Sequence, residues 1–419
     1  MPTPNIQPIA GISNTGTMNI SINKRDVDPR LFYLDYDKYP LASAIFAMGS
    51  SLERDGEGVY TVKRGATVKQ TPCINPKFEW TESDRLKQAF HPAAAVTAVA
   101  TSVTVSSDDA PYFLTGQHLI MINAAGEIEE VRITAGGQTT TLTVSRNVGS
   151  TGAIALTTGD YVYAAPVHRA ENSTSVDANQ IKSETLYNQV MFLSESYGLT
   201  RIQKATVSFY SGDSYDQVRK EALDRLKQRM EMAFWFGRRD VLNSTTNPIY
   251  CNGGIFWSLQ NLFTDVPTVD VGGILTKPVW EAAAGKAMRH GSRNKVVFLG
   301  SAGLNAINGF VSGTIAPSDP NIKEFGTLIT SYRTAGGSVS FMYEPLFDEV
   351  TALNGTAVVL DMKNIGWRYL AGNGENLNLH AEEDIQENDR SVKKGEWIVV
   401  GGLQVSTGKS HMIIINIQG

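Results

Sequence analysis

The side chains that could do chemistry in this chain are six histidines, two cysteines and one acidic run, and their spacing brings none of them together. No two histidines form an HxxxH or HxH pair, so neither converging metal ligands nor a positioned general base is indicated. The histidines are His91, His118, His168, His290, His380 and His411. Cys73 and Cys251 lie far apart and outside any CxxC motif, which predicts two free thiols.

The acidic run at 382–389 lacks the spacing of an EF-hand loop, so a solvated turn is favoured over a cation site. Residues 297–303 read VFLGSAG, which superficially suggests a dinucleotide site, but a third glycine and a suitably placed acidic residue are missing. There is no GxSxG elbow and no Walker sequence. We therefore expect no catalytic residue, no metal and no cofactor.

Composition points away from several other classes of protein. Charged residues make up 19% of the 419 residues, below the globular average of about 25%, and glycine is abundant. This favours a β-rich architecture with much of its surface hidden. The formal net charge of −5 argues against a dedicated nucleic-acid binder. The start of the chain lacks the pattern of a signal peptide, and no apolar run has the length of a membrane span.

The strongest local signal is a long amphipathic helix at 214–237, which would extend about 36 Å. Its apolar stripe comprises Tyr215, Val218, Ala222, Leu226, Met230, Ala233 and Phe234. Its opposite, charged face comprises Arg219, Lys220, Asp224, Lys227 and Glu231, with i,i+4 pairs at 220–224 and 227–231. Two interpretations are open: a solvated surface helix, or a helix whose charged face meets another copy of the protein.

On either side of this helix the sequence pattern changes several times. Segments 59–68 and 187–207 alternate like strands and are predicted to pair as the legs of a long hairpin. Between them, residues 92–166 are predicted to form a small antiparallel β domain with strands at 102–106, 118–122, 128–134, 139–145 and 160–164. Beyond the helix, a mixed α/β region is expected, with helices at 276–290 and 302–310, a strand at 295–299 and closing strands at 397–405 and 411–417. Gly253 and Gly254 are predicted to make a tight turn that brings the backbone close to another element.

This order of parts resembles the major capsid proteins of tailed bacteriophages with the Hong-Kong-97-type fold, in the subfamily with a β-domain insertion in the extended loop. The resemblance covers nearly the whole chain, and it depends on the order of several short motifs. They are EW at 79–80, TLTVSRNVGST at 141–151, EMAFWF at 231–236, NGGI at 252–255, VVFL at 296–299, AVVLD at 357–361 and the closing run 395–417.

The resemblance implies an α+β fold with an N-terminal arm, an extended loop, a peripheral domain with a long spine helix, an axial domain and an inserted small antiparallel β domain. The implied boundaries are 1–48 for the arm, 49–91 for the first part of the peripheral domain and extended loop, 92–166 for the inserted β domain, 167–212 for the second leg of the extended loop, 213–254 for the spine helix, 255–390 for the axial domain and 391–419 for the return strands.

The implied function is structural: self-assembly as hexamers and pentamers into an icosahedral shell that encloses double-stranded DNA, formed in the host bacterial cytoplasm. Expected partners are other copies of the chain, portal, scaffold and decoration proteins, and packaged DNA through weak, sequence-independent contact, with no membrane. The chain shows no helical scaffolding segment at its start, which suggests a separate scaffold or none. Candidate inter-subunit contacts are Ile6, Ile9, Ile12, Lys63, Lys69, Arg219, Lys220, Lys227 and Glu231.

Three alternatives stay open at this point. An encapsulin-type nanocompartment shell has the same fold but holds enzyme cargo, and the arm and insert favour a virus over it. A β-rich binding or adhesion protein of the virion would use residues 92–166 as its binding part. An enzyme ranks last, because no catalytic constellation is present. For Lys63 and Lys69 there is also a simpler interpretation, since exposed lysines on an edge strand discourage aggregation.

Overall fold

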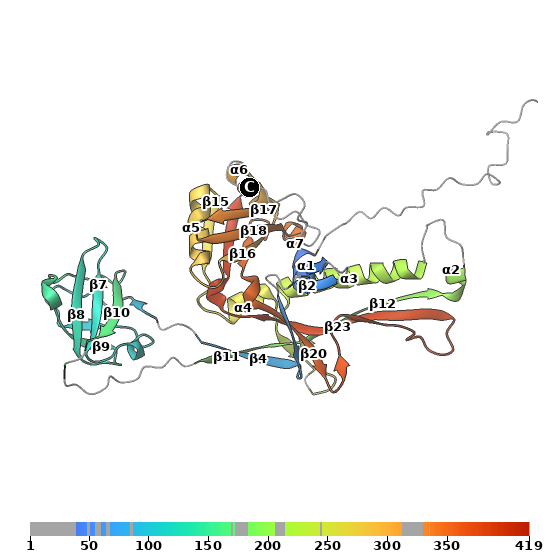
Figure 1. Ribbon diagram of the computed structural model, residues 1–419, viewed down its shortest axis with the longest axis horizontal. Helices are drawn as coiled ribbons and strands as arrows, with labels where there is room; N and C mark the ends of the chain where they lie inside the picture. Colours follow the sequence, from blue (N-terminus) through green and yellow to red (C-terminus); the bar gives the residue numbers. More distant parts are fainter. Residues whose placement is uncertain are drawn as a thin grey trace, which may run out of the picture. The chain divides into compact units, whose positions relative to one another are not determined.

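The structure is a computed structural model that describes residues 39–47, 51–54, 60–63, 68–83, 87–168, 171, 183–205, 214–243, 245–311, 330–334 and 336–418. It is α+β, as expected, with helices and strand-rich sheets along the chain (Figure 1). The chain divides into two compact units, a main unit of Met1–Glu79 with Tyr187–Gly419 and a second unit of Trp80–Leu186. Each is described by itself.

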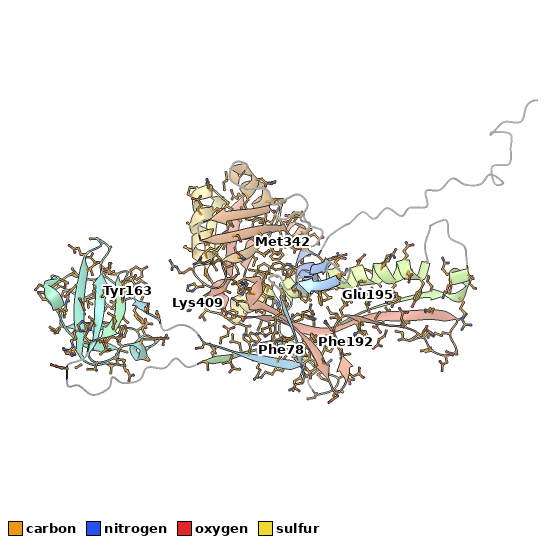
Figure 2. The ribbon with its side chains drawn as sticks, viewed as in Figure 1. Phe78, Tyr163, Phe192, Glu195, Met342 and Lys409 are labelled. Carbon is orange, nitrogen blue, oxygen red and sulfur yellow. The ribbon has the colours of Figure 1, made fainter. Side chains whose placement is uncertain are left out.

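The predicted long helix is confirmed as α3 (Ser214–Phe236). Its apolar stripe faces inward: Ala222, Leu226, Met230 and Phe234 are fully buried. The helix runs alongside β12 (Met191–Thr200) (Figure 1). Figure 2 labels Glu195 on this strand, whose carboxylate accepts a hydrogen bond of 2.9 Å from Arg225 of α3. Ion pairs therefore flank the apolar contact between helix and strand.

The predicted hairpin between 59–68 and 187–207 is wrong for the described residues. β2 (Tyr60–Lys63) pairs with its neighbour β1 (Ser51–Arg54), and β11 (Glu184–Gln189) pairs with β4 (Lys77–Glu82). β12 pairs antiparallel with β23 (Val392–Val405) over ten residues, and α2 (Arg201–Ala205) replaces the end of the predicted strand. The alternation of apolar and polar residues correctly indicated strands here. It did not show that the partner of β12 is the 14-residue β23, which offers a longer pairing than a local hairpin would.

β23 is central in a sheet ordered β12-β23-β20-β21, with β20 (Ile365–Gly372) and β21 (Glu375–Asn376) on its other side. β3 (Lys69–Cys73) adds to β20 in parallel, and β22 (His380–Glu382) pairs with β23. Gly401 allows this sheet to pack closely, because a Cβ there would lie 2.3 Å from the Trp367 ring. Any larger residue at 401 would displace that buried indole.

The second sheet of the main unit has the order β15-β24-β19-β16-β18-β17. Its strands are β15 (Thr268–Ile274), β24 (Met412–Gln418), β19 (Ala357–Leu360), β16 (Asn294–Leu299), β18 (Gly337–Tyr343) and β17 (Thr330–Thr334). The predicted helices are confirmed as α5 (Lys277–Met288) and α6 (Ser301–Val311), and the strands at 295–299 and 411–417 as β16 and β24. Trp280 of α5 packs against Phe341 of β18.

The end of α3 is fixed to this sheet by aromatic packing. Trp235 contacts the rings of Phe298 on β16 and Phe347 on α7 (Pro345–Glu349), with centroids 5.3 and 4.8 Å away. The predicted glycine turn lies beside it, before α4 (Ile255–Asn261). A Cβ on Gly254 would come within 2.7 Å of the Phe234 carbonyl oxygen, so the close backbone approach is confirmed.

The second unit contains an antiparallel sheet ordered β5-β10-β7-β8-β9-β6. Its strands are β5 (Ala89–Phe90), β10 (Tyr161–Val167), β7 (Gln117–Ile122), β8 (Ile128–Ala135), β9 (Thr141–Ser145) and β6 (Ser102–Thr104). All five predicted strands of this segment are present. Burial alternates along β9, as a sheet with one buried face requires. Phe90, Phe113 and Leu119 are fully buried in its core.

The motif at 141–151 has a structural role in this unit. Arg146 forms an ion pair with the fully buried Glu129 at 2.5 Å and also donates to the carbonyl oxygens of Thr97, Ala100 and Ile154. Burial opposes ionisation of Glu129, but the hydrogen bonds from Arg146 and from two backbone amides outweigh it, so its pKa lies below the ordinary value. Arg146 thus joins several loops to the sheet.

Candidate functional site

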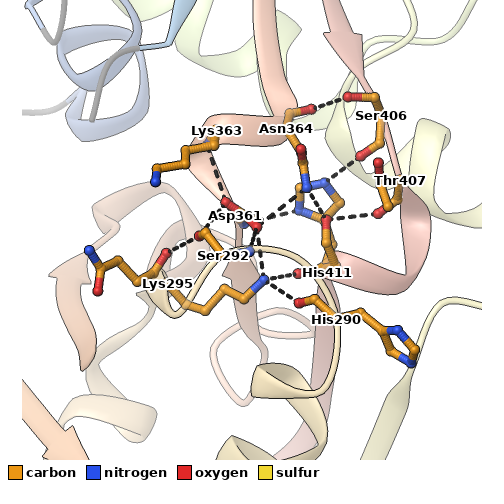
Figure 3. A network of polar contacts seen from close by, with 11 residues as sticks. His290, Ser292, Lys295, Asp361, Lys363, Asn364, Ser406, Thr407 and His411 are labelled. Carbon is orange, nitrogen blue, oxygen red and sulfur yellow. Dashed lines mark hydrogen bonds and ion pairs between the residues drawn. The ribbon is translucent and has the colours of Figure 1, made fainter. Parts of the chain in front are cut away.

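A fully buried ion pair lies where three segments of the main unit meet (Figure 3). Lys295 of β16 places its Nζ 3.0 Å from Asp361, which follows β19. The same ammonium donates to the carbonyl oxygens of His290 and Ser410, at 2.9 and 2.8 Å. All three protons of the ammonium therefore have acceptors, as a buried lysine requires.

Asp361 is the hub of this network. Its carboxylate accepts hydrogen bonds from the Ser292 backbone N–H at 2.6 Å and hydroxyl at 2.7 Å, besides the bond from Lys295. Burial opposes ionisation, yet these donors outweigh it and hold the pKa of Asp361 below its ordinary value. Burial lowers the pKa of Lys295, and the Asp361 carboxylate offsets part of that shift. The two charges stabilise each other in a site closed to substrate.

His411 completes the network, and its neighbours fix its tautomer. The Asp361 backbone N–H donates to Nδ1 at 3.2 Å, so Nδ1 carries no proton. Nε2 lies 3.1 Å from the Ser406 carbonyl oxygen and therefore carries the proton. Burial lowers the pKa of His411 to about 4, and the neighbouring Lys295 charge acts in the same direction. The imidazole is neutral and has no access to solvent, so it links segments and does not act as a base.

The depressed pKa of His411 predicts acid sensitivity. In the unfolded chain His411 takes up a proton near pH 6.5, whereas in the folded chain it does so only near pH 4. The stability that the neutral imidazole contributes is therefore complete above pH 6.5 and is lost as pH falls to about 4. The shift corresponds to about 3 kcal/mol. Urea unfolding at several pH values should show His411→Gln with a flatter profile over this window. Parallel profiles would contradict the assignment.

A second buried polar group anchors α1 (Pro40–Ala47). Glu231 of α3 accepts hydrogen bonds from the backbone amides of Leu41 and Ala42, at 2.9 and 2.6 Å. The sequence placed Glu231 on the charged outer face of the helix, and this is wrong: the residue is 1% exposed. A glutamate one position from the apolar Met230 borders the buried stripe, and here the unsatisfied amides of a helix N-terminus give it a buried partner.

Glu231 shares its site with Glu344, the residue before α7. The Trp235 Nε1–H lies 3.1 Å from an oxygen of each carboxyl group. Burial, and then the Glu231 charge, raise the pKa of Glu344 to about 10. Burial likewise raises the pKa of Glu231. With three donors facing it, Glu231 is the ionised member, and the pair holds one proton on Glu344 at neutral pH.

Two tyrosines and an acid form a cluster at the first turn of α3: Tyr215 is on α3, Tyr197 is on β12 and Glu383 directly follows β22. The hydroxyl groups of Tyr197 and Tyr215 donate to Glu383 at 2.8 and 2.5 Å. Burial and the Glu383 carboxylate raise the pKa of Tyr197 to about 12 and raise that of Tyr215 as well. Glu383 is exposed, as expected for a solvated acidic turn, and its hydrogen bonds to the two tyrosines tie the 382–389 loop to β12 and α3. Phenols with raised pKa values are poor nucleophiles, so this cluster is structural.

The structure places the predicted inter-subunit contact residues in different environments. Arg219 is within 3.4 Å of Glu383 and lies over the Trp397 ring, and Lys227 is 3.9 Å from Asp224, so both have partners within the chain. Lys69 and Lys220 are exposed. Ile6, Ile9, Ile12 and the side chain of Lys63 lie outside the described residues. Cys73 and Cys251 are free thiols whose pKa values are raised by burial.

These networks hold segments together and expose no reacting group, so family membership decides the function. A model of the SU10 major capsid protein family matches residues 12–418. The chain belongs to the SU10 major capsid protein family. It is a structural protein of a bacteriophage capsid, it assembles with its own copies into the shell, and its place is the virion. The expected α+β tailed-phage capsid protein is confirmed. Within the described residues, the helices include none with the length and apolar character of a membrane span.

The other comparisons find low sequence identity to known proteins. No curated protein matches it. A Gordonia phage Cozz structure covers 97% of this chain and 96% of its own, with 12% identity and a TM-score of 0.44. Mycobacterium phage Patience covers 60% and 77%, with 12% identity and a TM-score of 0.39. The SrpI encapsulin of Synechococcus elongatus covers 58% and 78%, with 12% identity and a TM-score of 0.38. The assignment depends on the family match.

Proposed function

We propose that this capsid protein assembles as hexamers and pentamers into an icosahedral shell that encloses double-stranded DNA. In this proposal residues 1–48 are the arm, 49–91 the first part of the peripheral domain and extended loop, 92–166 an outward-facing insert and 167–212 the second leg of the extended loop. Residues 213–254 are the spine helix of the peripheral domain, 255–390 the axial domain and 391–419 the return strands of the peripheral domain. Portal, scaffold and decoration proteins would be its partners, and assembly would take place in the host cytoplasm. The acidic net charge opposes tight binding to the DNA phosphates, so contact with the packaged DNA would be weak and sequence-independent.

The observation that carries the proposal is the set of large apolar side chains exposed on short or edge strands of the main unit. Phe192, labelled in Figure 2, is 62% exposed on β12, an edge strand of its sheet. β13 (Asp240–Leu242) and β14 (Ile249–Cys251) form a two-stranded ribbon on which Leu242 lies directly opposite Ile249. Both are about half exposed. Edges of this kind invite pairing with another chain, and in a shell that partner is a second subunit.

The ribbon supplies a test of this proposal. Replacing Leu242 and Ile249 by serine should change the free energy of unfolding by no more than about 1 kcal/mol, or about 0.5 kcal/mol for each residue, because both side chains are about half exposed in the single chain. The variant should nevertheless form at least tenfold fewer closed particles or rings in negative-stain microscopy of the purified full chain. Val99→Ser, at a residue of the second unit that is 88% exposed, is the matched control. Equal particle yield from the double variant would contradict a contact at the ribbon.

A further inference from the structure

Three potential metal ligands meet on neighbouring strands of the second unit, although they are far apart in the sequence. His118 is on β7, Glu130 is on β8 and His168 directly follows β10, and β7 lies between the other two strands. The pairing registers bring the three residues to one place: Ile120 pairs with Glu130, and Val167 pairs with Gln117. One ligand atom from each side chain lies within 4.8 Å of the others.

In the structure His118 and Glu130 contact each other directly, and the His168 ring lies beside them. His118 Nδ1 is already 2.7 Å from Glu130 Oε1, and the His118 and His168 rings are 4.5 Å apart at a nearly perpendicular 83°. A tetrahedral Zn²⁺ with bonds of about 2.0–2.2 Å needs ligand atoms roughly 3.3 Å apart. Small rotations of the side chains would meet that requirement. The two imidazoles would then contribute nitrogen ligands, and the carboxylate an oxygen.

Burial and charge define the character of the site. His118 is 8% exposed and forms its base, Glu130 is partly buried and His168 is exposed, so one side is open to solvent. Arg132 pairs directly with His118 across β7 and β8 and adds one positive charge nearby. This charge opposes cation binding, so moderate affinity is expected. An imidazole–carboxylate set of borderline softness favours Zn²⁺ over Mg²⁺ or Ca²⁺.

We propose that His118, Glu130 and His168 bind one Zn²⁺ ion, which ties the point where the chain leaves β10 to the middle of the sheet. Sequence spacing gave no sign of this site, because the three ligands come from three strands and are separated by up to 50 residues. The site is independent of the assembly proposed above. In the sheet the ion would act as a cross-link between β10, β7 and β8, and its open position would hold water.

The test uses the purified full-length chain, freed of metal by a chelator that is then removed. Titration with Zn²⁺ should show one ion per chain, and Co²⁺ should give the visible absorption of a low-symmetry site with nitrogen and oxygen ligands. Zn²⁺ should also raise the unfolding temperature of the second unit, since it binds only the folded sheet. His168→Ala should weaken binding at least tenfold, and its exposed position means that it should fold normally.

His91→Gln is the matched control, because His91 lies in the same unit but contacts the Asp160 carbonyl oxygen and Tyr161 instead. It should bind Zn²⁺ as the wild type does. The proposal is overturned if the wild-type chain binds no Zn²⁺ at micromolar concentrations. It is equally overturned if His168→Ala binds as tightly as wild type, or if His91→Gln loses as much affinity as His168→Ala. His118 is buried, so if a His118→Ala variant does not fold, the comparison of His168→Ala with wild type still tests the proposal.

Discussion

Replacing Lys295 by methionine is expected to lower the free energy of unfolding of the main unit by about 3–5 kcal/mol. The substitution keeps most of the buried volume but leaves the Asp361 carboxylate without its counter-charge in a site where both side chains are fully buried. The carbonyl oxygens of His290 and Ser410 also lose a donor. Urea unfolding followed by circular dichroism measures the loss.

A double substitution separates the ion pair from the packing around it. Lys295→Met combined with Asp361→Asn removes both charges, and the asparagine oxygen can still accept from Ser292. The double variant should therefore be more stable than either single variant, and the coupling energy follows from the double-mutant cycle. Lys286→Met, at an exposed position of α5, is the matched control and should stay within about 0.5 kcal/mol of wild type. Additive losses in the double variant would disprove the pairing argument.

Glu231→Ala is expected to destabilise the main unit by about 3 kcal/mol and to release α1 from α3. The change leaves the Leu41 and Ala42 amides without their carboxylate acceptor, and the Trp235 N–H keeps only its bond to Glu344. Hydrogen exchange at the first amides of α1 should rise far more than exchange in β16. Protection of α1 equal to that of wild type would show that Glu231 does not anchor the helix.

Glu344→Gln is the control for the shared proton. Glutamine copies the neutral, protonated carboxyl group, so the variant and the wild type should have similar stability near pH 4.5, where holding that proton costs the wild-type chain little. A folded-state pKa of about 10 against an ordinary value near 4.5 means that the wild-type chain loses stability as pH rises through this range. The variant should lose this slope, and its stability relative to wild type should increase with pH. An unchanged slope would place the proton elsewhere.

Periodicity predicted the elements of this fold well, because burial of one face imposes a pattern on the sequence that forms it. The stripe of α3, from Ala222 to Phe234, and the alternation of β9 illustrate this. The pairing of strands was harder to foresee. Nothing in the residues of β12 shows that its partner is β23, about 200 positions later, because pairing depends on lengths and faces that become comparable only in the folded chain.

The polar sites were the least predictable part. Lys295, Asp361 and His411 are ordinary residues in three separate segments, and only the sheet brings them together. Glu231 looked like a surface residue because the amides that bury it belong to the backbone of α1 and carry no signature in the sequence. The family resemblance, in contrast, could be seen in the order of short motifs, because that order survives when individual residues change.

The position of β23 and β24 near the end of the chain bears on how a subunit is made. β23 joins β12 to β20, and β24 joins β15 to β19, so both six-stranded sheets of the main unit are interrupted until these two strands have been made. During synthesis, neither sheet can close until residues 392–418 have emerged from the ribosome. Pairings of such high contact order form slowly and late. A chain that lacks β23 and β24 would thus have neither six-stranded sheet complete.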